Sequence, residues 1–386
     1  MGRQGASRQS LQLALISMTQ GSSRKRIGVL TSGGDCPGLN AVLRGIFCAS
    51  EELGWEVLGF RDGFEGMLVP GGDVMPLTRE NTAGIMQVGG TILGTTNKGH
   101  FTSKVAGGDR AVVPEEVIAK ASRTCRDLDL HAVIAIGGDG SLSTALQLYR
   151  AGFPIIGVPK TIDNDLEATA MTFGFDSAVA CVTDALDRLH TTAASHKRVI
   201  IVQVMGRHAG WIALWGGLAG AADVILIPEI PFALEHVSDF ITRRDEAGYK
   251  STMIVVAEGA RTRQGQQFRK QSATGEWRLG GIGDMLCQEI ESRTGKDTRV
   301  CVLGHLQRGG DPTTLDRILG IRFGVKAVQL ARDGKFGTMV SYQNYDVLDV
   351  PIAEAVHRLK RVPIDDQLID TARAIGISFG DVAVGE

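Results

Sequence analysis

Residues 132–141, AVIAIGGDGS, decide the fold class of this chain. The run 132–136 is apolar throughout, which is typical of a strand buried on both faces of a parallel sheet. It continues into a glycine-rich turn and then into a segment with helical spacing over 142–151. Because a helix N-terminus after a glycine turn can bind phosphate, this stretch predicts an anion-binding βα unit.

The same alternation of strand and helix continues along the chain. Strands are predicted over 27–31, 56–60, 132–136, 154–158, 199–204, 224–227, 253–257 and 299–303. Helices are predicted over 39–53, 114–127, 142–151, 176–191, 209–221 and 283–294. A single sheet usually holds about five to seven strands. The pattern therefore predicts an α/β fold with two Rossmann-like lobes, each a mainly parallel sheet flanked by helices. The polar stretch 262–276 is predicted to be a loop or mobile hairpin.

Composition excludes several classes of protein. The chain has 386 residues with 50 Gly, 43% hydrophobic residues and a net charge of −2. The glycines show no collagen period, and the chain is too apolar to be disordered. No apolar run approaches the roughly 18 residues of a membrane span. Near-neutral charge argues against nucleic acid as the main partner.

The two remaining compositional features concern the N-terminus and the cysteines. The first 34 residues contain no Asp or Glu, and we expect an extension without folded structure over 1–25. Its composition also resembles a transit peptide, so organelle import and a true start at Met18 are the alternatives. The six Cys form no C-x-x-C pair, which favours reduced thiols and a cytoplasmic protein.

The most informative polar stretch is 159–165, PKTIDND, directly after a predicted strand. Ligands of open α/β sheets bind at the carboxyl ends of strands. One of the two carboxylates, Asp163 and Asp165, can act as a general base and the other can bind a metal. Lys160 and a metal would keep Asp163 ionised. Asp139, in the glycine turn, is a further candidate ligand for Mg²⁺.

Basic residues flank two other predicted strands. Arg198 precedes 199–204 and Arg207 follows it, whereas Arg299 opens the strand that runs into GHLQRGG at 304–310. Because Arg binds phosphate in a bidentate manner, this grouping favours an anionic ligand. Glu258 could accept sugar hydroxyl protons or pair with one of these Arg residues. No G-x-G-x-x-G before a helix and no Walker A motif is present, which argues against a dehydrogenase and a Walker-type ATPase.

Taken together, these segments resemble the 6-phosphofructokinase family from about residue 26 to 360. The motifs that carry the resemblance are SGGDCPGLN at 32–40, GGTILG at 89–94, IGGDGS at 136–141, PKTIDND at 159–165, VMGRHAGW at 204–211 and LGHLQRGG at 303–310. GGDG also occurs in NAD kinases and lipid kinases, but TIDND and LGHLQRGG discriminate against these.

The resemblance implies transfer of the γ-phosphoryl group of ATP to the C1 hydroxyl of fructose 6-phosphate, which is the committed step of glycolysis. It implies a nucleotide-binding lobe of 26–174 plus about 308–358, and a sugar-phosphate lobe of about 175–307 plus 359–386. The active site would lie in the cleft between them. It also implies a homotetramer or homodimer whose active sites are shared across subunits, with Mg²⁺ as cofactor.

The family's site residues map onto this chain by motif. The catalytic residues would be Asp163, Thr161 and Arg207, and the metal ligands would be Asp139 and Asp165. The nucleotide would contact Gly34, Asn97, Lys98, Gly138, Asp139, Gly140 and Ser141. The sugar phosphate would contact Thr161, Ile162, Asp163, Met205, Gly206, Arg207, Glu258, His305, Leu306, Gln307 and Arg308, with Arg198 and Arg299 reaching it from a second subunit.

Two positions bear on the phosphoryl donor. Gly140 is the residue of the ATP-dependent enzymes, because an Asp there would obstruct the α-phosphate of ATP. Lys160 is typical of pyrophosphate-dependent enzymes. We predict ATP as the donor, since Lys160 can neutralise the transferred phosphate in either case. The alternatives are a pyrophosphate-dependent enzyme and a catalytically silent sugar-phosphate-binding paralogue. A silent paralogue is expected to lose Asp163, Asp139 or Arg207, and all three are present.

Overall fold

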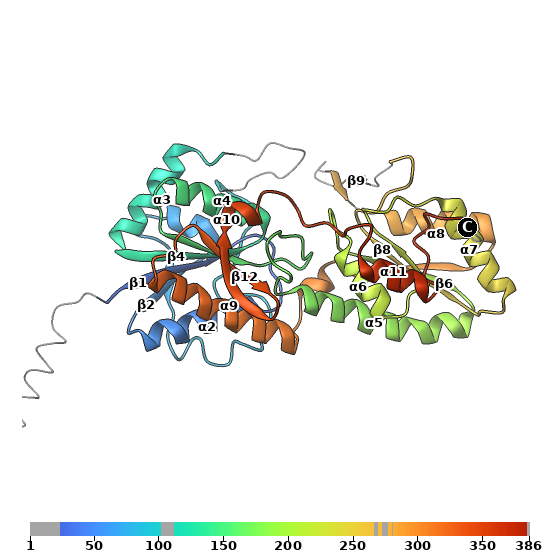
Figure 1. Cartoon of the computed structure of the whole chain (residues 1–386), viewed down its shortest axis with the longest axis horizontal. Helices are drawn as coiled ribbons and strands as arrows, with labels where there is room; N and C mark the ends of the chain where they lie inside the picture. Colours follow the sequence, from blue (N-terminus) through green and yellow to red (C-terminus); the bar gives the residue numbers. More distant parts are fainter. Residues whose placement is uncertain (1–23, 102–111, 266–268, 272–276, 280, 384–386) are drawn as a thin grey trace, which may run out of the picture.

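The computed structural model describes residues 24–101, 112–265, 269–271, 277–279 and 281–383. Apart from Arg24 and Lys25, the extension predicted over 1–25 lies outside the described residues. Two lobes lie side by side along the long axis of the molecule, as Figure 1 shows. Within the described ranges, no helix is both long and apolar enough to cross a membrane.

The first lobe is built on a seven-stranded sheet with the order β13-β12-β5-β4-β1-β2-β3. Neighbouring strands in the run from β12 to β2 are parallel, whereas β13 and β3 are antiparallel additions at the two edges. The strands are β1 (Arg26–Thr31), β2 (Glu56–Phe60), β3 (Val74–Pro76), β4 (Leu130–Gly137), β5 (Ile155–Pro159), β12 (Thr338–Gln343) and β13 (Asp346–Pro351).

The second lobe is built on a four-stranded parallel sheet with the order β11-β6-β8-β7. Its strands are β6 (Val199–Val204), β7 (Val224–Leu226), β8 (Thr252–Ala257) and β11 (Thr298–Val302). In the stretch predicted to be a loop or hairpin, β9 (Arg269–Gln271) pairs antiparallel with β10 (Trp277–Leu279). Of the two structures predicted for 262–276, a loop or a hairpin, the backbone forms a hairpin. Part of this stretch lies outside the described residues.

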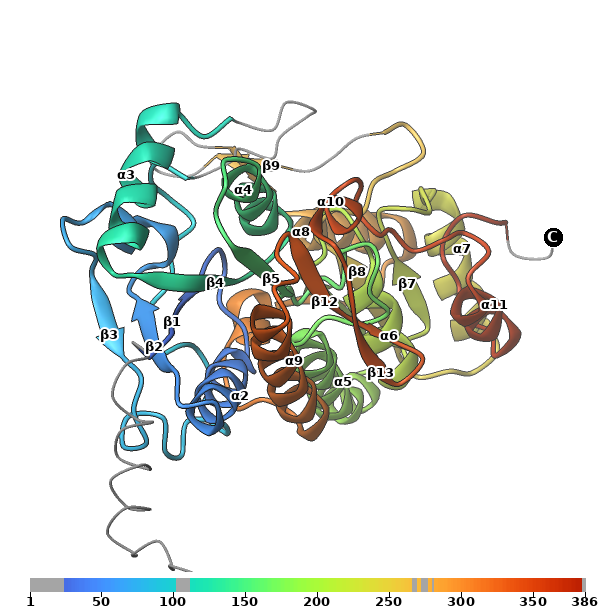
Figure 2. The same ribbon diagram turned by 60° about the vertical axis from the view of Figure 1, so that its left-hand side comes forward.

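Helices cover both faces of each sheet, and Figure 2 separates the two layers of the first lobe. The helices are α2 (Leu39–Glu52), α3 (Glu115–Asp127), α4 (Asp139–Arg150), α5 (Phe175–His196), α6 (Trp211–Ala219), α7 (Leu234–Glu246), α8 (Ile282–Thr294), α9 (Thr314–Arg332), α10 (Ile352–Ala355) and α11 (Gln367–Ala374), with the 3₁₀ segments η1 (Gly63–Leu68) and η2 (Gly304–Arg308).

Strand β4 shows why the strands are apolar at every position. Its residues Ile134 and Ile136 belong to the core cluster beneath α2 and α9, whereas Val133 and Ala135 belong to the cluster beneath α3 and α4. Each face of the strand therefore packs against helices, as two-sided burial requires. The first of these clusters continues into the second lobe through α5 and α6, so the two lobes share one apolar core.

Helices α2 and α9 pack closely because glycines remove side chains from the contact. A Cβ at Gly324 of α9 would lie 2.4 Å from the carbonyl oxygen of Val42, and a Cβ at Gly45 of α2 would lie 2.7 Å from that of Ile321. Carbon atoms do not approach backbone oxygens this closely, so any side chain would push the helices apart. The contact fixes α9 under the first sheet.

The predicted α/β fold with two lobes is confirmed, and the predicted strands overlap the observed ones. One boundary matters for function. Helix α4 begins at Asp139, three residues before the predicted start at 142, with Gly138 as its N-cap. The glycine-rich turn thus leads directly into the first turn of α4, whose backbone N–H groups have no partner within the helix.

Candidate active site

The two glycine-rich turns that follow β1 and β4 meet at one cavity of about 300 Å³. It lies at the carboxyl edge of the first sheet, where ligands of parallel sheets bind. Its lining residues are Ser32, Gly33, Gly34, Phe64, Glu65, Thr96, Asn97, Lys98, Phe101, Gly138, Asp139, Gly140, Ser141, Lys160, Thr161 and Arg308. All the residues predicted to contact the nucleotide are therefore brought together.

Backbone contacts explain why these turns need glycine. The Gly33 N–H donates to the Thr96 carbonyl at 3.1 Å, and the Lys160 N–H donates to the Gly137 carbonyl at 2.9 Å. A Cβ at Gly137 would lie 2.3 Å from the Cβ of Ser141. The absence of side chains thus lets three loops converge, and the N-terminus of α4 faces the cavity with the positive end of its dipole.

Besides the exposed Lys98, two cations line this cavity. Lys160 is only 4% exposed, and its Nζ donates to the carbonyl oxygen of Gly34. Burial lowers the pKa of Lys160. Arg308 donates from Nη1 to the carbonyl oxygen of Asp35 at 3.1 Å, and a Cβ at Gly34 would lie 2.8 Å from the same Nη1. Together with the α4 N-terminus, these groups suit the cavity to phosphate oxygens.

The carboxylates of the PKTIDND loop stand beside this cavity. Thr161 lines it, and the Thr161 hydroxyl donates to Asp165 Oδ1 and accepts from the Asp163 N–H, both at 3.1 Å. Asp163 Oδ1 is buried and has no hydrogen-bond partner among the described residues. A buried oxygen without a partner calls for an explanation, and a substrate atom beside Asp163 would supply one.

Burial decides the protonation of both carboxyls. Burial and, to a smaller extent, the charge of the nearby Asp165 raise the pKa of Asp163 to about 7, although Arg308 and Lys160 oppose the shift. Burial also raises the pKa of Asp165, although the hydrogen bond from Thr161 works against this. In the chain alone, therefore, burial outweighs the effect of Lys160 that was expected to keep Asp163 ionised.

A second group of polar residues lies at the carboxyl ends of β6 and β8. Glu258 follows β8, and burial raises the pKa of this carboxyl, while the charges of Arg207, Arg308 and His305 lower it. A Cβ at Gly259 would lie 2.1 Å from the Arg207 carbonyl oxygen, and Gly206 has φ 127°. Glycine at these positions lets the turn after β6 approach β8, which brings Arg207 to Glu258.

Some predicted contact residues do not offer their side chains to the site. Ile162 is fully buried in the core, so only its backbone can face a substrate. Gln307 is 1% exposed; its Oε1 accepts from the Met205 N–H at 3.2 Å and its Nε2 donates to the Gly304 carbonyl at 3.1 Å. Gln307 thus supports the Met205 backbone. Leu306 is 67% exposed.

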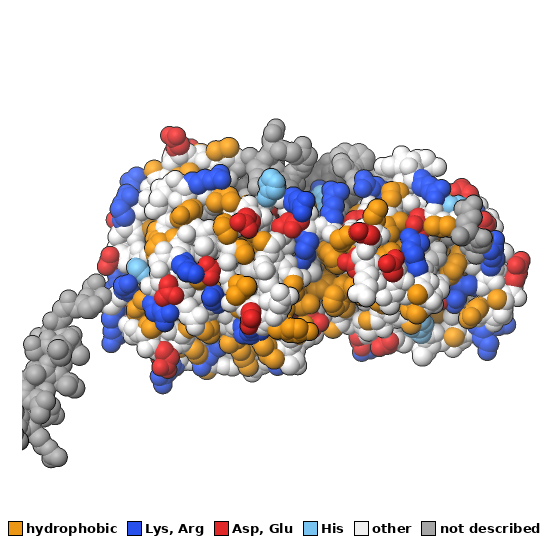
Figure 3. Space-filling view, in the orientation of Figure 1, with side chains coloured by type: hydrophobic (Ala, Val, Ile, Leu, Met, Phe, Trp, Pro, Cys, Tyr) orange, Lys and Arg blue, Asp and Glu red, His pale blue; other side chains and the backbone are white. Residues whose placement is uncertain are grey.

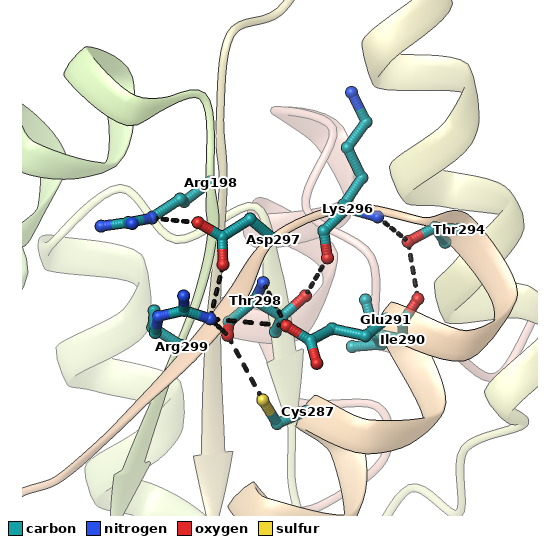
Figure 4. A network of polar contacts seen from close by, with 9 residues as sticks. All are labelled: Arg198, Cys287, Ile290, Glu291, Thr294, Lys296, Asp297, Thr298 and Arg299. Carbon is teal, nitrogen blue, oxygen red and sulfur yellow. Dashed lines mark hydrogen bonds and ion pairs between the residues drawn. The ribbon is translucent and has the colours of Figure 1, made fainter.

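Arg198 and Arg299 lie at the opposite edge of the second sheet, one strand length away from Arg207: Arg198 directly precedes β6, and Arg299 is the second residue of β11. Figure 4 shows both pointing at Asp297. Arg198 Nε and Arg299 Nη1 each lie 2.5 Å from a carboxylate oxygen of Asp297. Within one chain, these two residues are not brought to Asp163.

Besides Ser32 and Gly33 of the first glycine turn, four lining residues of the cavity were not among the predicted site residues: Phe64, Glu65, Thr96 and Phe101. The rings of Phe64 and Phe101 have centroids 5.3 Å apart, and Glu65 Oε1 accepts from the His100 N–H at 2.6 Å. They come from η1 and from the loop after GGTILG, and neither segment carries a strand or helix pattern that would indicate its position. The aromatic pair gives the cavity an apolar wall suited to a ring system.

Comparisons with known proteins agree on one family. The family model described as "Phosphofructokinase" matches residues 26–331. The "ATP-dependent 6-phosphofructokinase" of Chloroflexus aurantiacus is 51% identical over 360 residues, which cover 93% of this chain and 99% of that protein. The "Pyrophosphate--fructose 6-phosphate 1-phosphotransferase" of Amycolatopsis methanolica is 49% identical over 342 residues, covering 88% of this chain and 96% of that protein.

Among solved structures, phosphofructokinase from Pichia pastoris in the T-state is 31% identical and superposes with a TM-score of 0.75. The match covers 92% of this chain and 39% of that much longer chain. The likeness therefore extends across both lobes.

Proposed function

The chain belongs to the phosphofructokinase family, and from this premise we propose that it transfers the γ-phosphoryl group of ATP to the C1 hydroxyl of fructose 6-phosphate, giving fructose 1,6-bisphosphate and ADP. The main support for the proposal is that the cavity formed by the two glycine turns lies beside the buried carboxyls of PKTIDND. A phosphate-binding cavity is joined there to a base. Positioning and electrostatic stabilisation supply most of the catalysis in phosphoryl transfer.

The nucleotide lobe would comprise 26–174 and about 308–358, and the sugar-phosphate lobe about 175–307 and 359–386. In support, β12 and β13 join the first sheet although they follow the second in sequence. ATP phosphates would lie on the turns at Gly34 and Gly138 to Ser141, with Asn97 and Lys98 beside them. The wall of Phe64 and Phe101 would contact the base.

Asp163 would accept the proton of the C1 hydroxyl, with Thr161 orienting the reacting phosphoryl group. A base is most effective when its pKa lies near the working pH, and burial brings Asp163 into that range. Arg207, Glu258 and His305 would bind the sugar phosphate together with the backbone of Met205 and Gly206. Arg308, near both the cavity and Glu258, would lie between donor and acceptor.

Mg²⁺ would be held by Asp139, with Asp165 as a second carboxylate. Among the described residues, no cluster of three or more His, Cys, Asp or Glu forms a protein metal cage. This donor set nevertheless fits Mg²⁺, which usually takes one or two carboxylates plus phosphate oxygens and water. When bound, Mg²⁺ would neutralise charge on the phosphates.

Arg198 and Arg299 would serve the active site of a second subunit, which explains their distance from Asp163 in one chain. Apolar side chains gather where the two lobes meet on the face in Figure 3. Exposed apolar patches of this kind favour subunit association. We therefore infer a homotetramer or homodimer. The proposed location is the cytoplasm, with import into an organelle as the alternative if residues 1–25 act as a transit peptide.

ATP rather than pyrophosphate would be the donor. Gly140 lines the cavity at the start of α4, where an Asp would add charge beside the phosphates. Lys160 lines the same cavity, and its Nζ donates to the Gly34 carbonyl oxygen. The positive charge of Lys160 would neutralise phosphate charge with either donor. Relatives named as ATP-dependent and relatives named as pyrophosphate-dependent have similar sequence identity to this chain, so the donor has to be measured.

The test compares initial rates with fructose 6-phosphate and either Mg-ATP or Mg-pyrophosphate. We expect faster turnover with Mg-ATP. Gly140→Asp should lower the rate with ATP much more than Gly140→Ala, which adds a methyl group without charge. Faster turnover with pyrophosphate would establish the alternative donor. Turnover with neither donor would favour a silent sugar-phosphate-binding paralogue.

A further inference from the structure

The loop after β5 carries two residues in the left-handed backbone region. Asn164 has φ 49° and Ala168 has φ 59°. Residues other than glycine persist in this region only where the surroundings hold them. Asn164 stands between Asp163 and Asp165, so its backbone conformation sets the direction of both carboxyls. The groups that hold Asn164 therefore bear directly on the geometry of the site.

Lys360 supplies such a hold. Its Nζ lies 3.1 Å from Asn164 Oδ1, 2.9 Å from the Thr169 carbonyl oxygen and 3.1 Å from the Ala170 carbonyl oxygen. These three acceptors match the three N–H donors of an ammonium group. The backbone N–H of Lys360 also donates to the Asp165 carbonyl at 2.8 Å. One residue from far along the chain thus contacts the loop at 164–165 and again at 169–170.

Lys360 is in turn fixed to the second lobe. It lies in the segment between α10 and α11, which crosses from the first lobe to the second in Figure 1. Trp211 Nε1, at the start of α6, donates to the Lys360 carbonyl at 3.0 Å. The Lys360 ammonium also lies 5.7 Å from the centroid of the Trp211 ring, within the range of a cation–π contact.

The environment of this ammonium differs from that of a surface lysine. Burial lowers the pKa of Lys360 to about 8, and the carboxylates of Asp165 and Glu167 oppose that shift. A half-buried cation is tolerated here because its hydrogen bonds are satisfied. Substituting it would leave the loop carbonyls and Asn164 Oδ1 without these donors.

We propose that Lys360 is a positioning residue for phosphoryl transfer: anchored on Trp211 of the second lobe, its ammonium fixes Asn164 and thereby aims Asp163 and Asp165. The inference rests on the proposed function of the loop. It assigns a role in that reaction to the segment between α10 and α11, outside the motifs that carry the family resemblance.

The first test is Lys360→Met in the full-length protein, which keeps the length of the side chain and removes its donors. We expect kcat to fall about tenfold to hundredfold, as a small misplacement of a catalytic group can cause. KM for both substrates should change by less than about threefold, because the loop would still bind them. The matched control is Arg358→Met. Arg358 pairs with Glu167 of the same loop but is 76% exposed. Removing such an exposed ion pair should leave kcat unchanged.

A second variant and a second readout keep the test decisive. Asn164→Gly retains access to the left-handed conformation but removes the side-chain acceptor. Because both residues act through the same contact, kcat of the double variant should be no lower than that of Lys360→Met alone. Amide exchange at Ala170 and Thr172, whose N–H groups donate to the Tyr342 carbonyl and to Asn164 Oδ1, should accelerate in Lys360→Met.

The proposal is overturned if Lys360→Met retains kcat, if only KM rises, or if Arg358→Met loses as much. If Lys360→Met does not fold, Asn164→Gly alone decides, and an unchanged kcat in that variant contradicts the inference. Failure of the proposed function is distinguishable, because the unmodified protein would then phosphorylate fructose 6-phosphate with neither donor. The exchange experiment would still report whether Lys360 holds the loop.

Discussion

Asp163 is buried against a second carboxyl, Asp165, and this pairing sets the pH range in which it can accept a proton. Burial and like charge both favour the protonated form, and together they raise the pKa of Asp163 to about 7. Because the two carboxyls interact, the titration observed in an assay belongs to the pair. The pKa of Asp163 is thus set by its burial and its charged neighbours.

A pH profile follows from this shift. Below about pH 7 the base is protonated and cannot accept the C1 proton, so kcat/KM should fall about tenfold per pH unit on acidification. Above that pH the base is ionised, and the profile should level off. Steady-state rates between pH 5.5 and 8.5 measure this. Asp163→Asn should lower kcat by about 10²–10⁴-fold and lose the acidic limb. A flat profile in the unmodified protein would contradict the assignment.

At the scale of single residues, the sequence correctly indicated which residues line the cavity where those residues follow a predicted strand. Asp139, Lys160 and Thr161 all come directly after strands, and all line the cavity. The role of Gln307 could not be read from the sequence, because whether an amide faces a substrate or a backbone depends on tertiary packing. Phe64 was missed for a similar reason, since η1 has no periodicity that indicates a direction.

At the scale of elements, the contact between α2 and α9 depends on glycine. We predict that Gly324→Ala destabilises the protein by about 1–3 kcal/mol, because the added methyl group meets the Val42 carbonyl. The higher helix propensity of Ala offsets only about 1 kcal/mol of this cost. Denaturant unfolding at one protein concentration measures the change. Gln329→Ala, at an exposed position of the same helix, should stay within about 0.5 kcal/mol. Equal stabilities of the two variants would refute the argument.

Three of the elements that escaped prediction have identifiable physical causes. Helix α9 was not predicted, since its apolar residues are interrupted by Gly320 and Gly324, and glycine in a sequence signals a break. These same glycines permit its packing. Strand β12 is fully buried at only three of its six positions and β13 at none, so neither shows the apolar run of a central strand. In addition, β12 pairs with β5, which lies far away in the sequence. The buried central strands were predicted because two-sided burial makes them apolar throughout.

At the scale of the whole molecule, the position of Arg198 and Arg299 predicts shared active sites. Asp163→Asn and a double Arg198→Ala, Arg299→Ala variant should each be nearly inactive. After the two are mixed under conditions that exchange subunits, activity should return to about a quarter of the unmodified level, since half of the dimers are mixed and each has one intact site. Native mass spectrometry confirms the exchange. No recovery despite exchange would show that the arginines act within their own chain or not at all.

The order of the strands has a consequence for synthesis on the ribosome. Strand β5 ends at Pro159, but its neighbour β12 begins only at Thr338, and α9, which covers the sheet, begins at Thr314. At usual translation rates the nascent chain carries an open, apolar β5 edge for on the order of ten seconds. The strands of the second sheet all emerge before residue 303, so the middle of the chain can close first. A late-completed first sheet is therefore the part of the molecule most in need of chaperone protection.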